Sequence, residues 1–167
     1  MALRAGAIQA QQSAPADYQV KAAFLINFAR FIDWAGAGFT NAQSPLVIGV
    51  YGGAPFHGWL GRYAGAQSIA GHSVEVRHLS SLSQLGGCQI VYIAAPEAWQ
   101  RKDAIAAAAG SPVLTVGDAA DFCDSGGMIQ FVIQNNRVHF AINNSAARRA
   151  GLAISSQLLA LARRVKK

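Results

Sequence analysis

The chain has 167 residues, a length that suits one domain with a single core. It carries 14 Lys and Arg against 8 Asp and Glu, a formal net charge of +6, and 52% of its residues are hydrophobic while 13% are charged. This composition excludes an intrinsically disordered chain, and no apolar run approaches the roughly 18 residues that a membrane span requires.

The positive charge is concentrated at the C-terminal end. Four of the 14 cations lie in the last five residues, namely Arg163, Arg164, Lys166 and Lys167. Such a cluster is typical of a solvated helix end, where cations suit the helix dipole. No alternation of aromatic and basic residues accompanies it, so nucleic-acid binding is not expected.

The N-terminal part predicts a tail followed by a helix. Residues 1–16 are small and polar, and we interpret them as a flexible tail: a signal-peptide remnant, residues added by cloning or an ordinary loose N-terminus. Asp17 is expected to cap a helix over residues 18–34. Phe24, Phe28 and Phe31 share one face of that helix, which favours packing on a sheet.

The middle of the chain alternates short apolar runs with helical patterns. Buried strands and helices in alternation are typical of an α/β sandwich with a largely parallel sheet and helices on both faces. We therefore expect residues 17–167 to form a single α/β domain. The expected strands are residues 45–51, 73–77, 88–94 and 112–116, and the expected helices are residues 54–64, 97–109 and a short one around Phe122.

The C-terminal part has a different pattern. Residues 128–133 and 137–142 predict an antiparallel hairpin on a short polar turn. Asn143, Asn144 and Ser145 offer caps for a short helix that Gly151 ends. A last helix is expected from Ile154, with one apolar face made of Ile154, Leu158, Leu161, Ala162 and Val165.

The sequence carries no motif for catalysis, cofactor binding or metal binding. It lacks G-x-G-x-x-G, G-x-x-x-x-G-K-[ST] and G-x-S-x-G, and its four His residues have no ligand spacing. The one acidic cluster is Asp118, Asp121 and Asp124, which favours a solvated surface over general acid–base work. We expect no catalytic residue, cofactor or metal, and an enzyme that uses this cluster is kept only as an outside hypothesis.

The two cysteines are predicted to be free thiols. Cys88 begins a buried strand, and Cys123 follows the next parallel strand by about seven residues. This places them at opposite ends of the sheet, beyond the roughly 7 Å that a disulfide spans. The neighbouring Asp121 and Asp124 carboxylates raise the pKa expected for Cys123, so a reactive thiol is not expected.

Four segments, in order along the chain, resemble the YfiR-like periplasmic repressors. The resemblance spans residues 18 to about 165, nearly the whole chain, and its longest segment is the opening helix. The segments are residues 18–34, residues 114–118, residues 126–129 with 140–143, and residues 150–156 with 158–159.

The resemblance implies a secreted regulator that is not an enzyme. Such proteins bind the periplasmic sensing domain of an inner-membrane diguanylate cyclase and hold it inactive, which lowers cyclic di-GMP and biofilm formation. The resemblance also implies a removed signal peptide, a homodimer of α/β fold and sequestration by an outer-membrane lipoprotein. Better-known members carry two disulfides, but Gln130 stands here at the position that matches the partner of Cys123, and no cysteine precedes Cys88.

The two hypotheses, a protein-binding regulator and a ligand-binding sensor, each predict a functional surface. A regulator needs exposed apolar surface, for which the hairpin and the last helix are candidates. The alternative is a small-ligand-binding α/β domain that acts as a periplasmic sensor, with its ligand at the carboxyl ends of the strands. The expected partner or dimer surface is Ile129, Phe131, Leu152, Ile154, Leu158 and Leu161, and the expected ligand rim is Gly52, Gly53, Pro96, Gly117 and Asp118.

Overall fold

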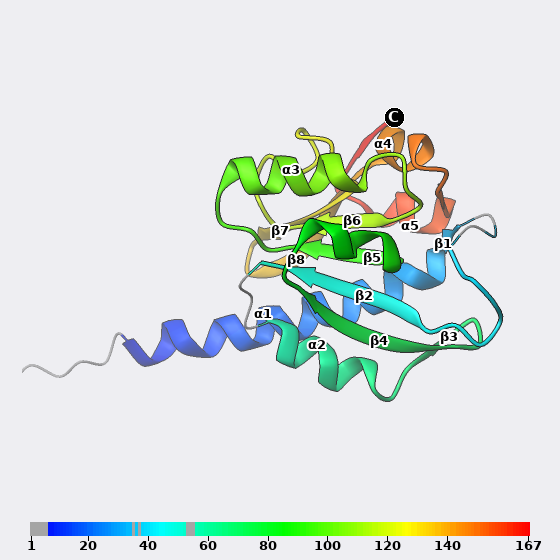
Figure 1. Cartoon of the computed structure of the whole chain (residues 1–167). Helices are drawn as coiled ribbons and strands as arrows, with labels where there is room; N and C mark the ends of the chain where they lie inside the picture. Colours follow the sequence, from blue (N-terminus) through cyan, green and yellow to red (C-terminus); the bar gives the residue numbers. More distant parts are fainter. Residues whose placement is uncertain (1–6, 35, 37, 53–55) are drawn as a thin grey trace, which may run out of the picture.

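The computed structural model describes residues 7–34, 36, 38–52 and 56–167. Its main feature is a curled sheet of eight strands in the order β10-β8-β7-β6-β5-β2-β4-β3 (Figure 1). The strands are β2 (Leu46–Tyr51), β3 (Ser68–Ile69), β4 (His72–Leu79), β5 (Ile90–Ile93), β6 (Leu114–Gly117), β7 (Ile129–Gln134), β8 (Arg137–Asn143) and β10 (Arg164–Lys166).

The sheet is largely parallel, as the sequence predicts. Strands β4, β2, β5, β6 and β7 run in one direction. The hairpin partner β8 runs against them, β10 pairs parallel with β8, and β3 pairs antiparallel with β4. The central strands β2, β5 and β6 are almost wholly buried, which explains why they read as unbroken apolar runs.

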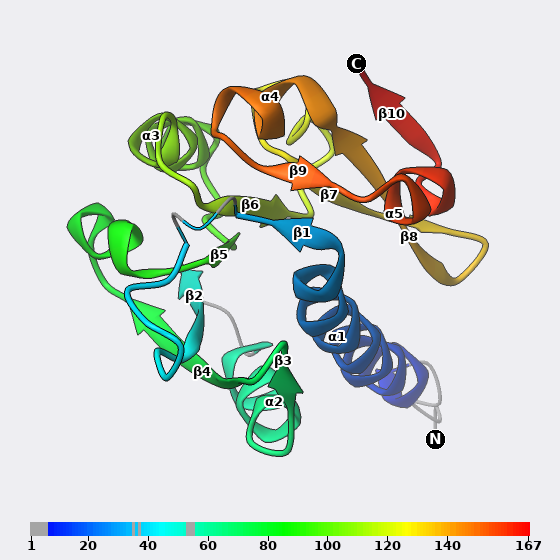
Figure 2. The same cartoon turned by 90° about the vertical axis from the view of Figure 1, so that its right-hand side faces the viewer.

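Helices cover both faces of the sheet, as expected (Figure 2). On one face, α1 (Ala7–Phe28) and α2 (Phe56–Ala64) pack over the larger core, to which Leu25, Phe28 and Leu60 contribute. On the other face, α3 (Ala98–Ala108) and the 3-10 helix η2 (Leu82–Gly87) cover a smaller core around Ile93 and Phe122. The fold is therefore an α/β sandwich with two cores.

The first helix differs from its prediction at both ends. It begins at Ala7, so Asp17 does not cap it; residues 7–14 are mostly Ala and Gln, which have high helix propensity. The helix ends at Phe28 and is followed by η1 (Ala29–Phe31) and β1 (Ile32–Asp33). Strand β1 pairs with β9 (Ala153–Ile154), and this pairing takes the backbone hydrogen bonds that a longer helix would have used.

The predicted helix around Phe122 is a series of turns. Phe122 N–H donates to the carbonyl of Ala119 at 3.0 Å, and Gly127 N–H donates to that of Phe122 at 2.9 Å. The Phe122 ring fills the space above Gly117, where a Cβ would lie 2.6 Å from the ring. Burial of this ring and the turn hydrogen bonds, which include one from Ser125 N–H to the carbonyl of Asp121 at 2.8 Å, together fix the local path of the chain.

The C-terminal hairpin and the short helix after it are confirmed. Asn135 and Asn136 form its turn with φ of 53° and 58°, values that Asn tolerates better than most residues. Helix α4 (Asn144–Arg149) is capped by Asn143, whose side chain accepts a hydrogen bond from Ala146 N–H at 3.1 Å. Local sequence signals specify both elements.

The predicted long last helix is wrong. Ile154 lies in β9, helix α5 (Ser156–Leu161) has only six residues, and Val165 lies in β10. Arg163 N–H donates to the carbonyl of Phe140 at 2.8 Å, which starts the pairing of β10 with β8. The chain leaves the helix because the open edge of β8 offers it hydrogen bonds.

Candidate functional site

A buried cation lies where α1 passes the carboxyl end of the sheet. Lys21 on α1 has a side chain that is 9% exposed, and its Nζ lies 3.2 Å from Oδ2 of Asp118. Tyr92 on β5 donates its hydroxyl to the same oxygen at 2.8 Å. Burial, and then the Asp118 charge, raise the pKa of the Tyr92 phenol, which stays a donor.

Asp118 is a residue of the expected ligand rim, but its partners Lys21 and Tyr92 were not predicted from the sequence. Lys21 precedes Leu25 by four residues and Phe28 by seven, so it lies on the apolar face of its helix. A charged residue in that position requires a partner, because a buried ammonium is costly when it is unpaired. A lysine on the apolar face of a helix therefore predicts a buried ion pair. Which carboxylate pairs with it depends on the tertiary fold.

The structure brings the described members of the expected ligand rim to one edge of the sheet. Gly52 and Pro96 follow the neighbouring strands β2 and β5, Gly117 is the last residue of β6, and Asp118 comes directly after it; Gly53 is outside the described residues. Helix α2 follows β2 on one face and α3 follows β5 on the other. This edge therefore contains a topological switch point, where open α/β sheets bind ligands.

The two rim glycines have roles in packing. Gly52 has φ of +102°, and a Cβ there would lie 2.8 Å from the backbone N of Ala95. Gly117 makes room for the Phe122 ring, and Asp118 is engaged by Lys21 and Tyr92. Ligand binding at this rim stays a prediction, since the chain's own packing accounts for these residue types.

The expected partner surface needs correction. Five of its six residues are buried, because α1 and the segment from α4 to α5 close over them. The rings of Phe24 and Phe28 lie 6.2 Å and 5.9 Å from that of Phe131. Leu161, which is 68% exposed, is the only exposed member. The buried members are Ile129, Phe131, Leu152, Ile154 and Leu158.

Both cysteines are buried and free. Cys88 precedes β5 at the amino end of the sheet, and Cys123 follows β6 at the opposite end. Burial raises the pKa of both thiols, that of Cys123 to about 11. Neither thiol is activated for nucleophilic chemistry, and the absence of a disulfide in solution remains a prediction for thiol counting.

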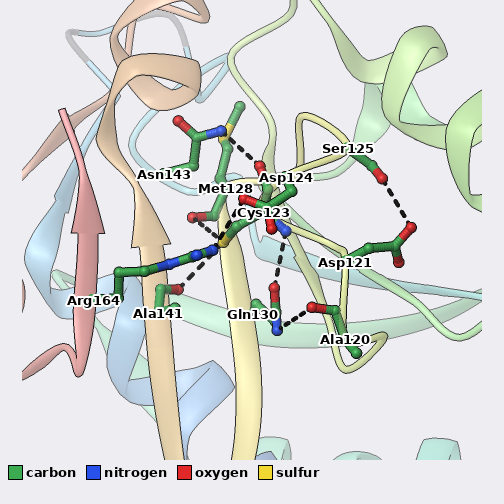
Figure 3. Close-up of polar contacts among 10 residues, drawn as sticks. All are labelled: Ala120, Asp121, Cys123, Asp124, Ser125, Met128, Gln130, Ala141, Asn143 and Arg164. Carbon is green, nitrogen blue, oxygen red and sulfur yellow. Dashed lines mark hydrogen bonds and ion pairs between the residues drawn. The ribbon is translucent and has the colours of Figure 1, made fainter.

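Cys123 belongs to a network of polar groups that joins three segments (Figure 3). Its backbone N–H donates to Oε1 of Gln130 at 3.1 Å, and Gln130 Nε2 donates to the carbonyl of Ala120 at 3.0 Å. Asn143 Nδ2 donates to the carbonyl of Cys123 at 3.0 Å. Gln130 thus makes, by hydrogen bonds, the link between the 120–123 turn and β7.

A groove of about 370 Å³ lies at the amino end of the sheet, opposite the expected rim. Its walls include Arg30, Trp34, Phe39 and His72. The Phe39 and His72 rings are stacked with centroids 3.9 Å apart, and His72 Nδ1 lies 2.6 Å from the carbonyl oxygen of Ser44. The groove has apolar and aromatic walls with a cation at its border.

The described residues thus form an α/β domain in which the polar group of Lys21, Tyr92 and Asp118 stabilises the fold. They include no group of three His, Cys, Asp or Glu side chains that could hold a metal ion. Across the described ranges, no helix is both long and apolar enough to span a membrane.

Comparison with known proteins gives the family. Residues 18–163 match the YfiR/HmsC-like family model, and the chain belongs to this family. Members are periplasmic regulatory proteins in cyclic di-GMP signalling and not catalysts. The match begins at Tyr18, where the resemblance in the sequence also begins.

The other two comparisons add little. The search of curated proteins gave no match. Among solved structures, the chain is similar to the ABC domain in complex with L-Trp from Streptococcus pneumonia, at 13% identity and a TM-score of 0.48. That match covers 71% of this chain and 54% of the other, so the chain spans about half of that structure's length. The likeness is too weak to support an inference about function.

Proposed function

We propose that this protein binds the periplasmic sensing domain of an inner-membrane diguanylate cyclase and holds the enzyme inactive. In this role it lowers cyclic di-GMP and biofilm formation, acts as a homodimer and is sequestered by an outer-membrane lipoprotein. The observation that carries the proposal is the family match over residues 18–163.

The chemistry of the described residues supports regulation by binding. Burial raises the pKa of both thiols, and Asp118 is held by Lys21 and Tyr92. These groups stabilise the fold and offer no activated nucleophile or free acid–base pair. A protein of this kind acts through the surface that it presents to a partner.

The test is capture followed by a cellular measurement. The purified full chain is mixed with the periplasmic domains of inner-membrane cyclases from the same genome, and cyclic di-GMP is measured in cells with and without the gene. We expect one domain to be retained and cyclic di-GMP to rise several-fold without the gene. If no domain is retained and cyclic di-GMP is unchanged, the proposal is wrong.

The groove beside Trp34 favours a second candidate, a sensor that binds a small apolar or aromatic ligand. A thermal shift screen with common metabolites tests it, with Phe39→Ala as the variant and Trp99→Ala, on exposed α3, as the control. A shift of several degrees that Phe39→Ala abolishes supports the sensor. No shift with any metabolite argues against it.

A further inference from the structure

Strand β10 is the outermost strand of the sheet, and its outer side pairs with no described strand (Figure 2). Arg163 N–H donates inward to the carbonyl of Phe140 on β8. In the register with β8, Arg164 lies opposite Ala141 and Lys166 opposite Asn143, two residues whose own main-chain groups bond to β7. The N–H and C=O groups of Arg164 and Lys166 therefore point inward to β8, and those of Val165 point outward. The edge of β10 therefore offers one donor and one acceptor, both from Val165, to an added strand.

This open edge is strongly basic. From residue 137 to the C-terminus the sequence has seven Lys and Arg and no Asp or Glu. Arg164 lies in the strand with a side chain that is 56% exposed, and Asp124 offers it one carboxylate at 3.1 Å. Helix α4 contacts β10 and carries Arg148 and Arg149 in its last turn. The cations that the sequence assigned to a helix end thus flank an open strand.

We propose that the β10 edge is a docking site for an extended acidic segment of a partner protein. The segment adds to the sheet as a further strand, with main-chain hydrogen bonds to Val165 and with carboxylates beside the side chains of Arg164 and Lys166. This proposal rests on the proposed function only in taking the partner to be a protein.

Charge decides which strand can add here. Cations on an edge strand repel a second copy of the same edge, which is how proteins avoid self-association. The same cations favour an acidic strand through complementary charge. An anionic lipid surface would attract the cations but would leave the outward N–H and C=O groups unused, so the open edge favours a peptide.

The experiment measures binding of a synthetic peptide, acetyl-Glu-Val-Glu-Val-Glu-Val-Glu-amide, to the full chain by calorimetry. The matched lysine peptide and vesicles of phosphatidylglycerol with phosphatidylcholine serve as comparison probes. Reversal of the edge charges, in the double variant Arg164→Glu with Lys166→Glu, should weaken peptide binding at least tenfold. The control double variant, Arg62→Glu with Lys102→Glu, makes the same change in net charge on α2 and α3 and should leave binding within twofold.

A second pair of variants tests the strand geometry apart from charge. Val165→Ala shortens the side chain and leaves the charges unchanged, while Val165→Pro also removes the outward N–H without removing a hydrogen bond to β8. We expect the Pro variant to bind the peptide at least threefold more weakly than the Ala variant, with equal thermal stability. Equal binding by all variants, or binding to the vesicles and not to the peptide, overturns the proposal; the cyclase capture experiment is unaffected by either outcome.

Discussion

At the scale of single residues, Cys123 shows how the fold sets the chemistry of a side chain. Its sulfur lies 3.6 Å from the carbonyl oxygen of Ala141 and 3.8 Å from that of Met128. Burial is the largest cause of its raised pKa, and Asp124 adds to it. A thiol held in this way is a structural group whose ionisation opposes folding.

This gives a prediction for alkaline pH. The pKa of Cys123 rises from 9.0 to about 11 on folding, so below pH 9 the thiol is protonated in both states. As pH rises from about 9 to 11, the unfolded chain releases the proton first, and the free energy of unfolding falls by about 2–3 kcal/mol. Urea titrations should show this loss in the native chain and a smaller one in Cys123→Ala. Parallel curves for the two proteins would contradict it.

The Lys21–Asp118 pair gives a second prediction. Asp118→Ala leaves Lys21 buried without its carboxylate, and we expect a loss of about 1–3 kcal/mol in stability, because Asp118 itself is half exposed. Lys21→Met keeps the volume and should change stability by less than about 1 kcal/mol. A double-mutant cycle measured by urea unfolding should show coupling; additive losses would mean that the pair contributes nothing.

At the scale of elements, the β7–β8 hairpin shows local signals that agree with the fold. Its two turn residues have positive φ, and its strands pair without interruption from Ile129 with Ile142 to Gln134 with Arg137. The turn places Phe131 opposite Phe140 on the face that packs against α1. This hairpin therefore couples the sheet to the first helix.

The turn can be improved by a single substitution. Asn136 has φ of 58°, which glycine adopts at lower cost, so Asn136→Gly should stabilise the protein by about 0.5 kcal/mol. Asn136→Ala should instead cost about 1 kcal/mol. Both values come from the urea unfolding midpoint at constant slope. A loss of stability in the Gly variant would show that the Asn side chain has a role of its own.

At the scale of the whole molecule, the sequence predicted the parallel sheet, the hairpin and the capped α4 well. Each of these depends on signals within a few residues, such as an unbroken apolar run or paired Asn residues. The path after Leu161 was wrong because it depends on the bond from Arg163 to Phe140, between residues far apart in the sequence. No local pattern contains that information.

The candidate surfaces were harder to predict for a related reason. An apolar residue such as Phe131 or Leu158 is suited to a core and to an interface, and only the position of α1 and α5 decides between them. The residues of the expected ligand rim lie at one edge of the sheet because the carboxyl ends of parallel neighbours must meet, and ligand binding there stays a prediction. Lys21 was missed because its partner Asp118 comes from the loop after β6, 97 residues further along the chain.

The contacts of Gln130 have a consequence for where this protein can be made. A protein that depends on disulfide bonds needs an oxidising environment to reach its full stability. The hydrogen bonds of the Gln130 side-chain amide form equally well in a reducing environment. We therefore expect the melting temperature to be the same with and without dithiothreitol. Expression in the bacterial cytosol, without export, should yield the native fold, and a melting temperature several degrees lower in reductant would show that a covalent bridge is present.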